Sequence, residues 1–451
     1  MLDLIVLLVL VAGIILVTAK LKISPFLALL GAAFIGAFAF RLPVDTIIPT
    51  ITESFGKTMG NIGLVILFGT MIGVILERSG GAIAMADALI KLIGTRFPTL
   101  TMSVIGYIVS IPVFCDSGFV ILNSLKKAIA GRAKVSLVAM SIALMTGLYA
   151  THTLVPPTPG PLAAAANLEV DSQLGLLIGL GLVVAAVSAL AGLLYANVFL
   201  KRDVELLPMP EGEVEESYED LKAAYGKLPN AFVAFLPILI PILLICLSSI
   251  AKLPSLPFGD GVFPAVVNFI GTPVIALAIG LISAVFLLRG SGKLARFNTQ
   301  IADSITIAAP ILMITSAGAA FGGVLGASSI TSFLSDNLAT LGLGIAVPFI
   351  ISAALKTAQG SSTVAMVTTS AMLLPLLPAL GLGSPVGGVL SVLAIGAGAM
   401  VVSHANDSYF WVVSQFSRIP TPVAYRTLTP ATAIQGVSAF AVVWVMSLFM
   451  L

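Results

Sequence analysis

Apolar segments about 20 residues long recur from one end of this chain to the other, and they constrain its fold more than any other feature of the sequence. An apolar helix of that length crosses the ~30 Å hydrocarbon core of a lipid bilayer. Hydrophobic residues make up 58% of the chain and charged residues only 9%, whereas soluble domains carry about 25% charged residues. The sequence therefore predicts an all-α polytopic membrane protein.

The few charged residues predict how the chain crosses the bilayer, because Lys and Arg concentrate on cytoplasmic loops. An external N-terminus, an external loop at residues 41–57 and a span at residues 61–76 place Arg78 to Arg96 on the cytoplasmic side. The next basic cluster, Lys126 to Lys134, belongs on that same side, yet residues 97–125 between the two clusters are short for two full spans. This segment is therefore predicted to be a re-entrant hairpin.

Two further segments are interrupted by polar residues. The chain has only two histidines, His152 and His404, and each follows a hydroxyl residue where a long apolar run ends. These positions predict a broken transmembrane helix at residues 135–167 and another at residues 385–416. Residues 347–378 are interrupted in the same way, which predicts a second re-entrant hairpin.

The order of these segments indicates an internal duplication. Residues 1–200 and residues 230–451 are each predicted to contain five transmembrane helices, one of them broken, plus one re-entrant hairpin. An odd number of crossings puts the two repeats in opposite orientations and leaves both termini external. Residues 201–229 hold eight of the 20 acidic residues of the chain and are predicted to form a cytoplasmic linker.

The interrupted segments are the candidate functional site, because broken backbone persists in a membrane only where it is buried in protein or lines a wet cavity. The N-termini of half-helices favour a carboxylate, and the nearby hydroxyl and amide groups suit a polyhydroxylated solute such as a sugar acid. The candidate substrate-binding residues are Asp116, Ser117, Gly118, His152, Thr153, Lys356, Gln359, Gly360, Ser361, Ser362, Thr363, His404, Asn406 and Asp407.

Four of these residues are also candidates for proton coupling. Asp116 and Asp407 are acids at membrane depth, which usually mark a proton or ion pathway. His152 and His404 titrate near neutral pH when unperturbed. A proton is therefore the expected coupling ion, and no cofactor, metal or nucleic acid is expected to bind.

Other interpretations of the same residues remain open. The histidines could simply hold a helix break by hydrogen bonding. Lys356 could extend its amine to the membrane surface instead of pairing with a substrate. A sodium-coupled carboxylate transporter would also use hydroxyl-rich hairpin tips. An intramembrane enzyme is disfavoured, because the chain contains neither a His-Glu-x-x-His nor a Gly-x-Ser-x-Gly motif.

Four separated motifs, in order along almost the whole chain, resemble the gluconate permease family. They are Phe114-Cys115-Asp116-Ser117-Gly118-Phe119, the run from Thr151 to Pro161, the run from Lys356 to Thr363, and Ser403-His404-Ala405-Asn406-Asp407-Ser408-Tyr409-Phe410-Trp411. The resemblance implies a proton-coupled importer of gluconate or a related sugar acid in a bacterial inner membrane. It also implies membership of the wider ion-transporter superfamily, whose members are commonly homodimers with an elevator-like motion.

Overall fold

The computed structural model of the chain describes residues 2–19, 23–202, 206–208, 225–251, 261–288, 293–328, 344–404 and 407–451, with a few single residues between these ranges. The first part of the chain forms α1 (Leu2–Ala19), α2 (Pro25–Ala39), α3 (Val44–Arg78), α4 (Gly81–Ile93), α5 (Pro98–Val109), α6 (Cys115–Ala133), α7 (Leu137–Leu154), α8 (Pro159–Asn167) and α9 (Leu174–Asn197). A short 3₁₀ turn, η1 (Asp171–Gln173), precedes α9.

The second part of the chain is also helical. It forms α11 (Ala231–Ala251), α12 (Val262–Ile270), α13 (Pro273–Val285), α14 (Lys293–Gly326), α16 (Ala346–Gln359), α17 (Ser362–Leu373), η3 (Leu374–Leu376), α18 (Pro385–Gly398), α19 (Ser408–Phe416) and α20 (Thr421–Met450). Within the described residues, five helices are long and apolar enough to cross a membrane, or up to seven spans if each of two bent helix pairs is one span. The prediction of an all-helical, multi-pass membrane protein is confirmed.

The structure corrects the topology predicted for residues 41–76. The expected external loop at residues 41–57 is mostly the first half of α3, a helix of 35 residues that bends by 42° between Gly60 and Gly63. The prediction assigned Asp45, Glu53 and Lys57 to a loop because they are charged. Charged residues do not break helices, and Asp45 in the first turn favours one by complementing the helix dipole.

Two further features concern helix continuity and the burial of charge. Residues 262–288 form a pair of helices, α12 and α13, bent by 68° at Gly271 and Thr272, which together are long and apolar enough for one broken span. Lys126, counted above within a cytoplasmic basic cluster, has no exposed surface. The sequence does not show whether a lysine amine reaches water, because the same hydrocarbon stem can lead to the surface or stay inside the protein.

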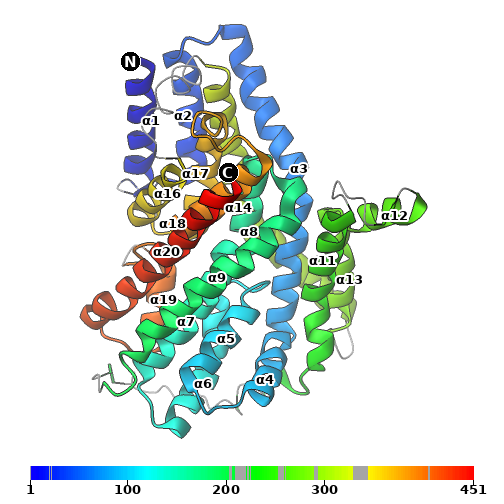
Figure 1. Cartoon of the computed structure of the whole chain (residues 1–451), viewed down its shortest axis with the longest axis vertical. Coiled ribbons are helices and arrows are strands. Elements are labelled where there is room, and N and C mark those ends of the chain that lie inside the picture. Colours follow the sequence, from blue (N-terminus) through cyan, green and yellow to red (C-terminus); the bar gives the residue numbers. More distant parts are fainter. Residues whose placement is uncertain are drawn as a thin grey trace.

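Burial separates central helices from peripheral ones. Every residue of α7 from Val138 to Leu154 is buried, as is every residue of α18 from Gly387 to Gly398. By contrast, only 22% of the most apolar window of α20 is buried. Helices that are apolar and buried on all sides form the centre of a bundle, while those with an exposed apolar face are suited to contact lipid. Figure 1 shows α11, α12 and α13 (green) grouped on one side, with α1 and α2 (blue) on the opposite side.

Small residues allow the central helices to approach closely. A side chain at Gly147 on α7 would overlap the backbone of Ser103 on α5, and one at Gly160 on α8 would press against Met366 on α17. Close backbone approach through glycine is typical of helix packing in membranes. The glycines thus help to bring the interrupted segments together.

Candidate functional site

Four helix interruptions lie in the described part of the chain at the predicted breaks. They separate α5 from α6, α7 from α8, α16 from α17, and α18 from α19. Each interruption leaves backbone N–H groups at the start of the following helix without an intrahelical partner. Two of these starts are capped by side chains: Ser361 accepts a hydrogen bond from Val364 N at 3.3 Å, and Asp407 accepts one from Tyr409 N at 3.0 Å.

A buried ion pair connects two of the interruptions. Lys356 Nζ, in the last turn of α16, lies 2.5 Å from Asp407 Oδ2, and the two side chains are 0% and 5% exposed. Lys356 also donates to the carbonyl oxygen of Gly360, and the Ser403 hydroxyl donates to the same Asp407 oxygen. The amine is therefore held inside the protein, which excludes the alternative that Lys356 extends to the membrane surface.

Asp116 adds a second carboxylate to this ion pair. It lies in the first turn of α6, near Ser408, where Asp407 and Lys356 both act on it electrostatically. Its Oδ1 atom is buried without a hydrogen-bond partner. Two carboxylates and one ammonium leave an excess of one negative charge when all three are ionised. We call Asp116, Lys356 and Asp407 the central charge cluster.

Two tyrosines beside the central charge cluster were missed by the sequence prediction. Tyr149 donates to Ala399 O at 3.1 Å, and Tyr409 donates to Met145 O at 3.1 Å, with the two ring centroids 5.2 Å apart. Both tyrosines lie near enough to Asp116 for its charge to act on them. Both residues lie within a few positions of His152 or Asp407, so their place beside the motifs could have revealed them.

The two histidines have different surroundings. His152 is buried, its ring centroid lies 5.9 Å from that of Phe114, and its Nδ1 atom has no hydrogen-bond partner. Asp407 is near enough to act on it electrostatically. His404 is partly buried, and its Nε2 atom lies 2.8 Å from Thr357 O. His152 therefore belongs beside the central charge cluster, while His404 holds the end of α16 against the break before α19.

The hairpin residues on α6 have partners of their own. Ser117 lies near Glu77, an acid near the end of α3 that sequence reasoning did not select. Gly118 packs against Leu148, since a side chain at Gly118 would overlap that leucine. These contacts turn Ser117 toward α3 and give Gly118 a packing role.

The remaining predicted residues lie at the start of α17 and on α7. Gly360 ends α16 with a φ of +91°, a conformation that favours glycine. The Ser362 hydroxyl is within hydrogen-bonding reach of Tyr149, whereas Thr153 donates to Tyr149 O at 3.0 Å within its own helix. Thr363 lies close to Gly160 at the start of α8. Asn406 and the side chain of Gln359 lie outside the described residues.

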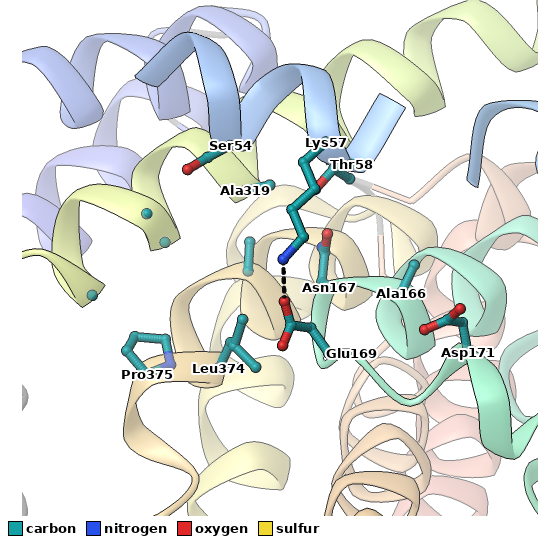
Figure 2. A pocket seen from close by; sticks show the side chains of 14 residues that line it. Ser54, Lys57, Thr58, Ala166, Asn167, Glu169, Asp171, Ala319, Leu374 and Pro375 are labelled. Atoms are coloured by element: carbon teal, nitrogen blue, oxygen red, sulfur yellow. Dashed lines mark hydrogen bonds and ion pairs between the residues drawn. The ribbon is translucent and has the colours of Figure 1, made fainter. Parts of the chain in front are cut away.

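A separate cavity of about 320 Å³ lies at the far ends of α8 and α17. Figure 2 shows the Lys57 side chain directed toward Glu169, with an Nζ to Oε1 distance of 2.7 Å. Asn167 joins α8 to α17 by donating to Val367 O at 3.1 Å. None of the predicted site residues lines this cavity. Among the described residues, no group of three or more His, Cys, Asp or Glu side chains could hold a metal ion.

Interrupted helices gathered around buried charges, inside a bundle of apolar spans, are typical of secondary transporters. This is the class of protein that the fold and the site define. A family model described as GntP family permease matches residues 2–449. The chain belongs to this family of permeases, which are transporters and not enzymes.

Individual relatives agree with this assignment, and a solved structure shares the fold. A gluconate permease from Pseudomonas aeruginosa is 32% identical over 448 residues, which cover 98% of this chain and 96% of that relative. The D-serine transporter DsdX from Escherichia coli is 32% identical over 446 residues, covering 98% of this chain and 97% of that relative. The structure of Neisseria gonorrhoeae MtrF, described as an antimetabolite efflux pump, superposes with a TM-score of 0.68 at 14% identity, covering 95% of this chain and 96% of that one. At that identity the superposition shows a shared fold.

Proposed function

We propose that this protein imports gluconate or a related sugar acid together with a proton by alternating access. The observation that carries the proposal is the central charge cluster, which is buried at the N-termini of α6 and α19 and combines the Lys356–Asp407 ion pair with a second carboxylate, Asp116. Family membership and the gluconate permease relatives support the substrate class.

The charges of the cluster suggest how a proton and an anion would be coupled. Lys356 is the cation best placed for a substrate carboxylate, but it is already bound to Asp407 and to Gly360 O. A proton bound by Asp116 or Asp407 removes the excess negative charge, and a proton on Asp407 also weakens its hold on Lys356. A monoanionic substrate can then pair with Lys356, and the loaded cluster has the same net charge as the empty one.

The hydroxyl groups of the substrate would be recognised by the surrounding polar groups. Ser362, at the start of α17, lies near Tyr149 on α7. Other hydroxyl residues at the two hairpin tips are Ser117, Ser361 and Thr363. The unpaired N–H groups at the start of α6 and α17 would contribute to holding the carboxylate. His152, with its unpartnered Nδ1, is the second candidate after Asp116 for carrying the coupled proton.

The larger arrangement is proposed from the sequence pattern and the resemblance. The two repeats, residues 1–200 and 230–451, would have opposite orientations in a homodimer of the bacterial inner membrane, with both termini external. Labelling of single cysteines introduced at the termini and in the linker at residues 201–229, from outside intact cells, tests this topology. Labelling of the linker from outside, or protection of both termini, would contradict it.

Uptake into proteoliposomes tests the function. The purified protein should accumulate labelled gluconate when the outside is made acidic, and a panel of aldonates, small hydroxy acids and D-serine should compete according to its substrate preference. D-serine belongs in the panel because a D-serine transporter is among the relatives. Accumulation that requires a sodium gradient at fixed pH would replace proton coupling with sodium coupling. Uptake that equilibrates but never concentrates the substrate under any gradient would contradict the proposal.

A further inference from the structure

Lys126 is a fully buried lysine outside the central charge cluster. It lies on α6, ten residues after Asp116, and has no exposed surface. Its Nζ atom lies 2.7 Å from Ser417 Oγ and 4.5 Å from the centroid of the Phe119 ring. A buried lysine with a hydroxyl and an aromatic ring as its neighbours is unusual, because lysines are almost never fully buried without an ionic partner.

No carboxylate compensates this amine among the residues that the structure describes. Lys127, the next residue, is a charged side chain that acts on the Lys126 amine, and it repels the ammonium form. The helices packed against α6 carry the following titratable or charged groups: Asp45, Glu53, Lys57, Glu77 and Arg78 on α3, Asp87 and Lys91 on α4, Tyr107 on α5, Tyr149 and His152 on α7, and Tyr409 on α19, with Arg418 two residues beyond α19. None of them forms an ion pair with Lys126 in the described structure. A buried ammonium without a counter-charge is strongly unfavourable, so these surroundings favour the neutral amine.

The hydroxyl groups around Lys126 can serve either protonation state. Ser417 Oγ lies 2.8 Å from Ser141 Oγ, and Ser141 Oγ lies 2.7 Å from Leu137 O. A neutral amine can accept the Ser417 hydroxyl proton, whereas an ammonium donates to Ser417 and turns that hydroxyl toward Ser141. Gain or loss of a proton therefore needs only hydroxyl rotation, and no side chain has to be replaced.

Lys126 is mechanically connected to the central charge cluster. Near the start of α6, Asp116 lies beside Ser408 on α19, and further along the same two helices Lys126 contacts Ser417 at the C-terminal end of α19. The Phe119 and Tyr409 rings meet edge to face between these two contacts, with centroids 6.3 Å apart. The two helices therefore run side by side in the same direction. A shift of α19 that accompanies release of Asp407 from Lys356 would move Ser417 relative to Lys126.

We propose that Lys126 is a second proton-binding site of the transport cycle, which is neutral when α19 packs against α6 and takes a proton when that packing opens. The proposal rests on the proposed proton symport. The proton reaches Lys126 from the central charge cluster, which receives it together with the substrate from the external side. It leaves for water on the side of the linker, where Leu207 N donates to Arg418 O at 2.8 Å next to Ser417, when the contact closes. The N–H bond of the ammonium forms and breaks, and no other bond changes.

Substitutions of Lys126 separate proton coupling from substrate movement. Lys126→Met is permanently neutral and keeps a stem of similar length. It is expected to lose concentrative uptake driven by a pH gradient while it retains exchange of labelled for unlabelled substrate without a gradient, since exchange needs no net proton movement. Lys126→His can still bind a proton, but at lower pH than lysine, and is expected to restore concentrative uptake with an optimum shifted to lower pH. Lys127→Met, on the next residue, is the matched control and should behave as the wild type.

Several results would overturn the proposal. If Lys126→Met concentrates substrate as the wild type does, the amine has no coupling role. The same conclusion follows if Lys126→Met elutes as a folded protein but loses exchange together with uptake. Lys126→His that behaves like Lys126→Met, or failure of both variants to fold, would make Lys126 a structural residue. Wild-type protein whose uptake does not respond to a pH gradient would instead overturn the proposed proton symport, so the two failures can be told apart.

Discussion

The ammonium of Lys356 and the carboxylate of Asp407 lie 2.5 Å apart in the centre of the bundle and connect the end of α16 to the start of α19. A buried pair of this kind contributes little net stability compared with apolar side chains, because both charges lose their hydration. We therefore infer that the role of this ion pair is to break and re-form during transport. In the proposed mechanism a substrate carboxylate competes with Asp407 for Lys356, and this competition is the physical basis of the coupling.

Removal of one partner of this pair should be costly, and removal of both should be mild. Asp407→Asn leaves the Lys356 ammonium without its ionic partner and is expected to destabilise the protein by about 3–5 kcal/mol. The double variant Lys356→Met with Asp407→Leu should recover most of that loss but should not transport. Thermal unfolding of the detergent-purified variants and proteoliposome uptake measure the two effects.

The exposed ion pair between Lys57 and Glu169 provides the control. These side chains are 66% and 58% exposed, so Lys57→Met should change the free energy of unfolding by no more than about 1 kcal/mol. Equal destabilisation by Lys57→Met and Asp407→Asn would contradict the assignment of Lys356 and Asp407 as a buried pair.

Replacement of Asp116 should remove the response to pH but preserve the binding geometry. Asp116→Asn keeps the shape of the side chain and cannot exchange a proton. Uptake should lose its stimulation by an acidic outside, while exchange at equal pH on both sides should persist. Exchange measured over a range of equal pH values on both sides compares the variant with the wild type. If Asp116→Asn and His152→Ala both keep full accumulation driven by a pH gradient, neither residue carries the coupled proton.

The sequence predicted the helical, multi-pass fold and the four interruptions because these depend on local composition. Apolar length specifies a span, and proline or polar residues specify a break. It could not separate the two alternatives for Lys356, because the same hydrocarbon stem serves a buried ion pair and a surface amine. Asp407, 51 residues later, became its partner only through folding.

Other residues were missed for a similar reason. Glu77 was not selected from the sequence, and only the packing of α3 against α6 brings it near Ser117. Lys126 was assigned to the same side by counting positive charges, although its amine is enclosed by Phe119 and Ser417. Counting charges shows which residues could face water, but it does not show which of them a neighbouring helix covers.

The Tyr149 hydroxyl should affect substrate binding more than folding. Its bond to Ala399 O is one neutral hydrogen bond, which contributes about 0.5–1.5 kcal/mol. Tyr149→Phe keeps the ring contact with Tyr409 and removes the hydroxyl near Ser362. A several-fold higher KM for uptake with little change in thermal stability is expected. An unchanged KM would remove Tyr149 from the substrate site.

Close packing of α5 against α7 should be the structural requirement most sensitive to small changes in volume. A side chain at Gly147 would overlap the backbone of Ser103, which cannot move aside as a flexible side chain could. Gly147→Ala is therefore expected to destabilise the protein, typically by about 1–3 kcal/mol for overpacking. Gly131 on α6 is the matched control, because no atom lies within 4 Å of the added carbon there. Gly131→Ala should stabilise its helix by about 0.5–1 kcal/mol. If the unfolding temperatures of the two variants shift in the same direction, α5 and α7 are not packed through Gly147.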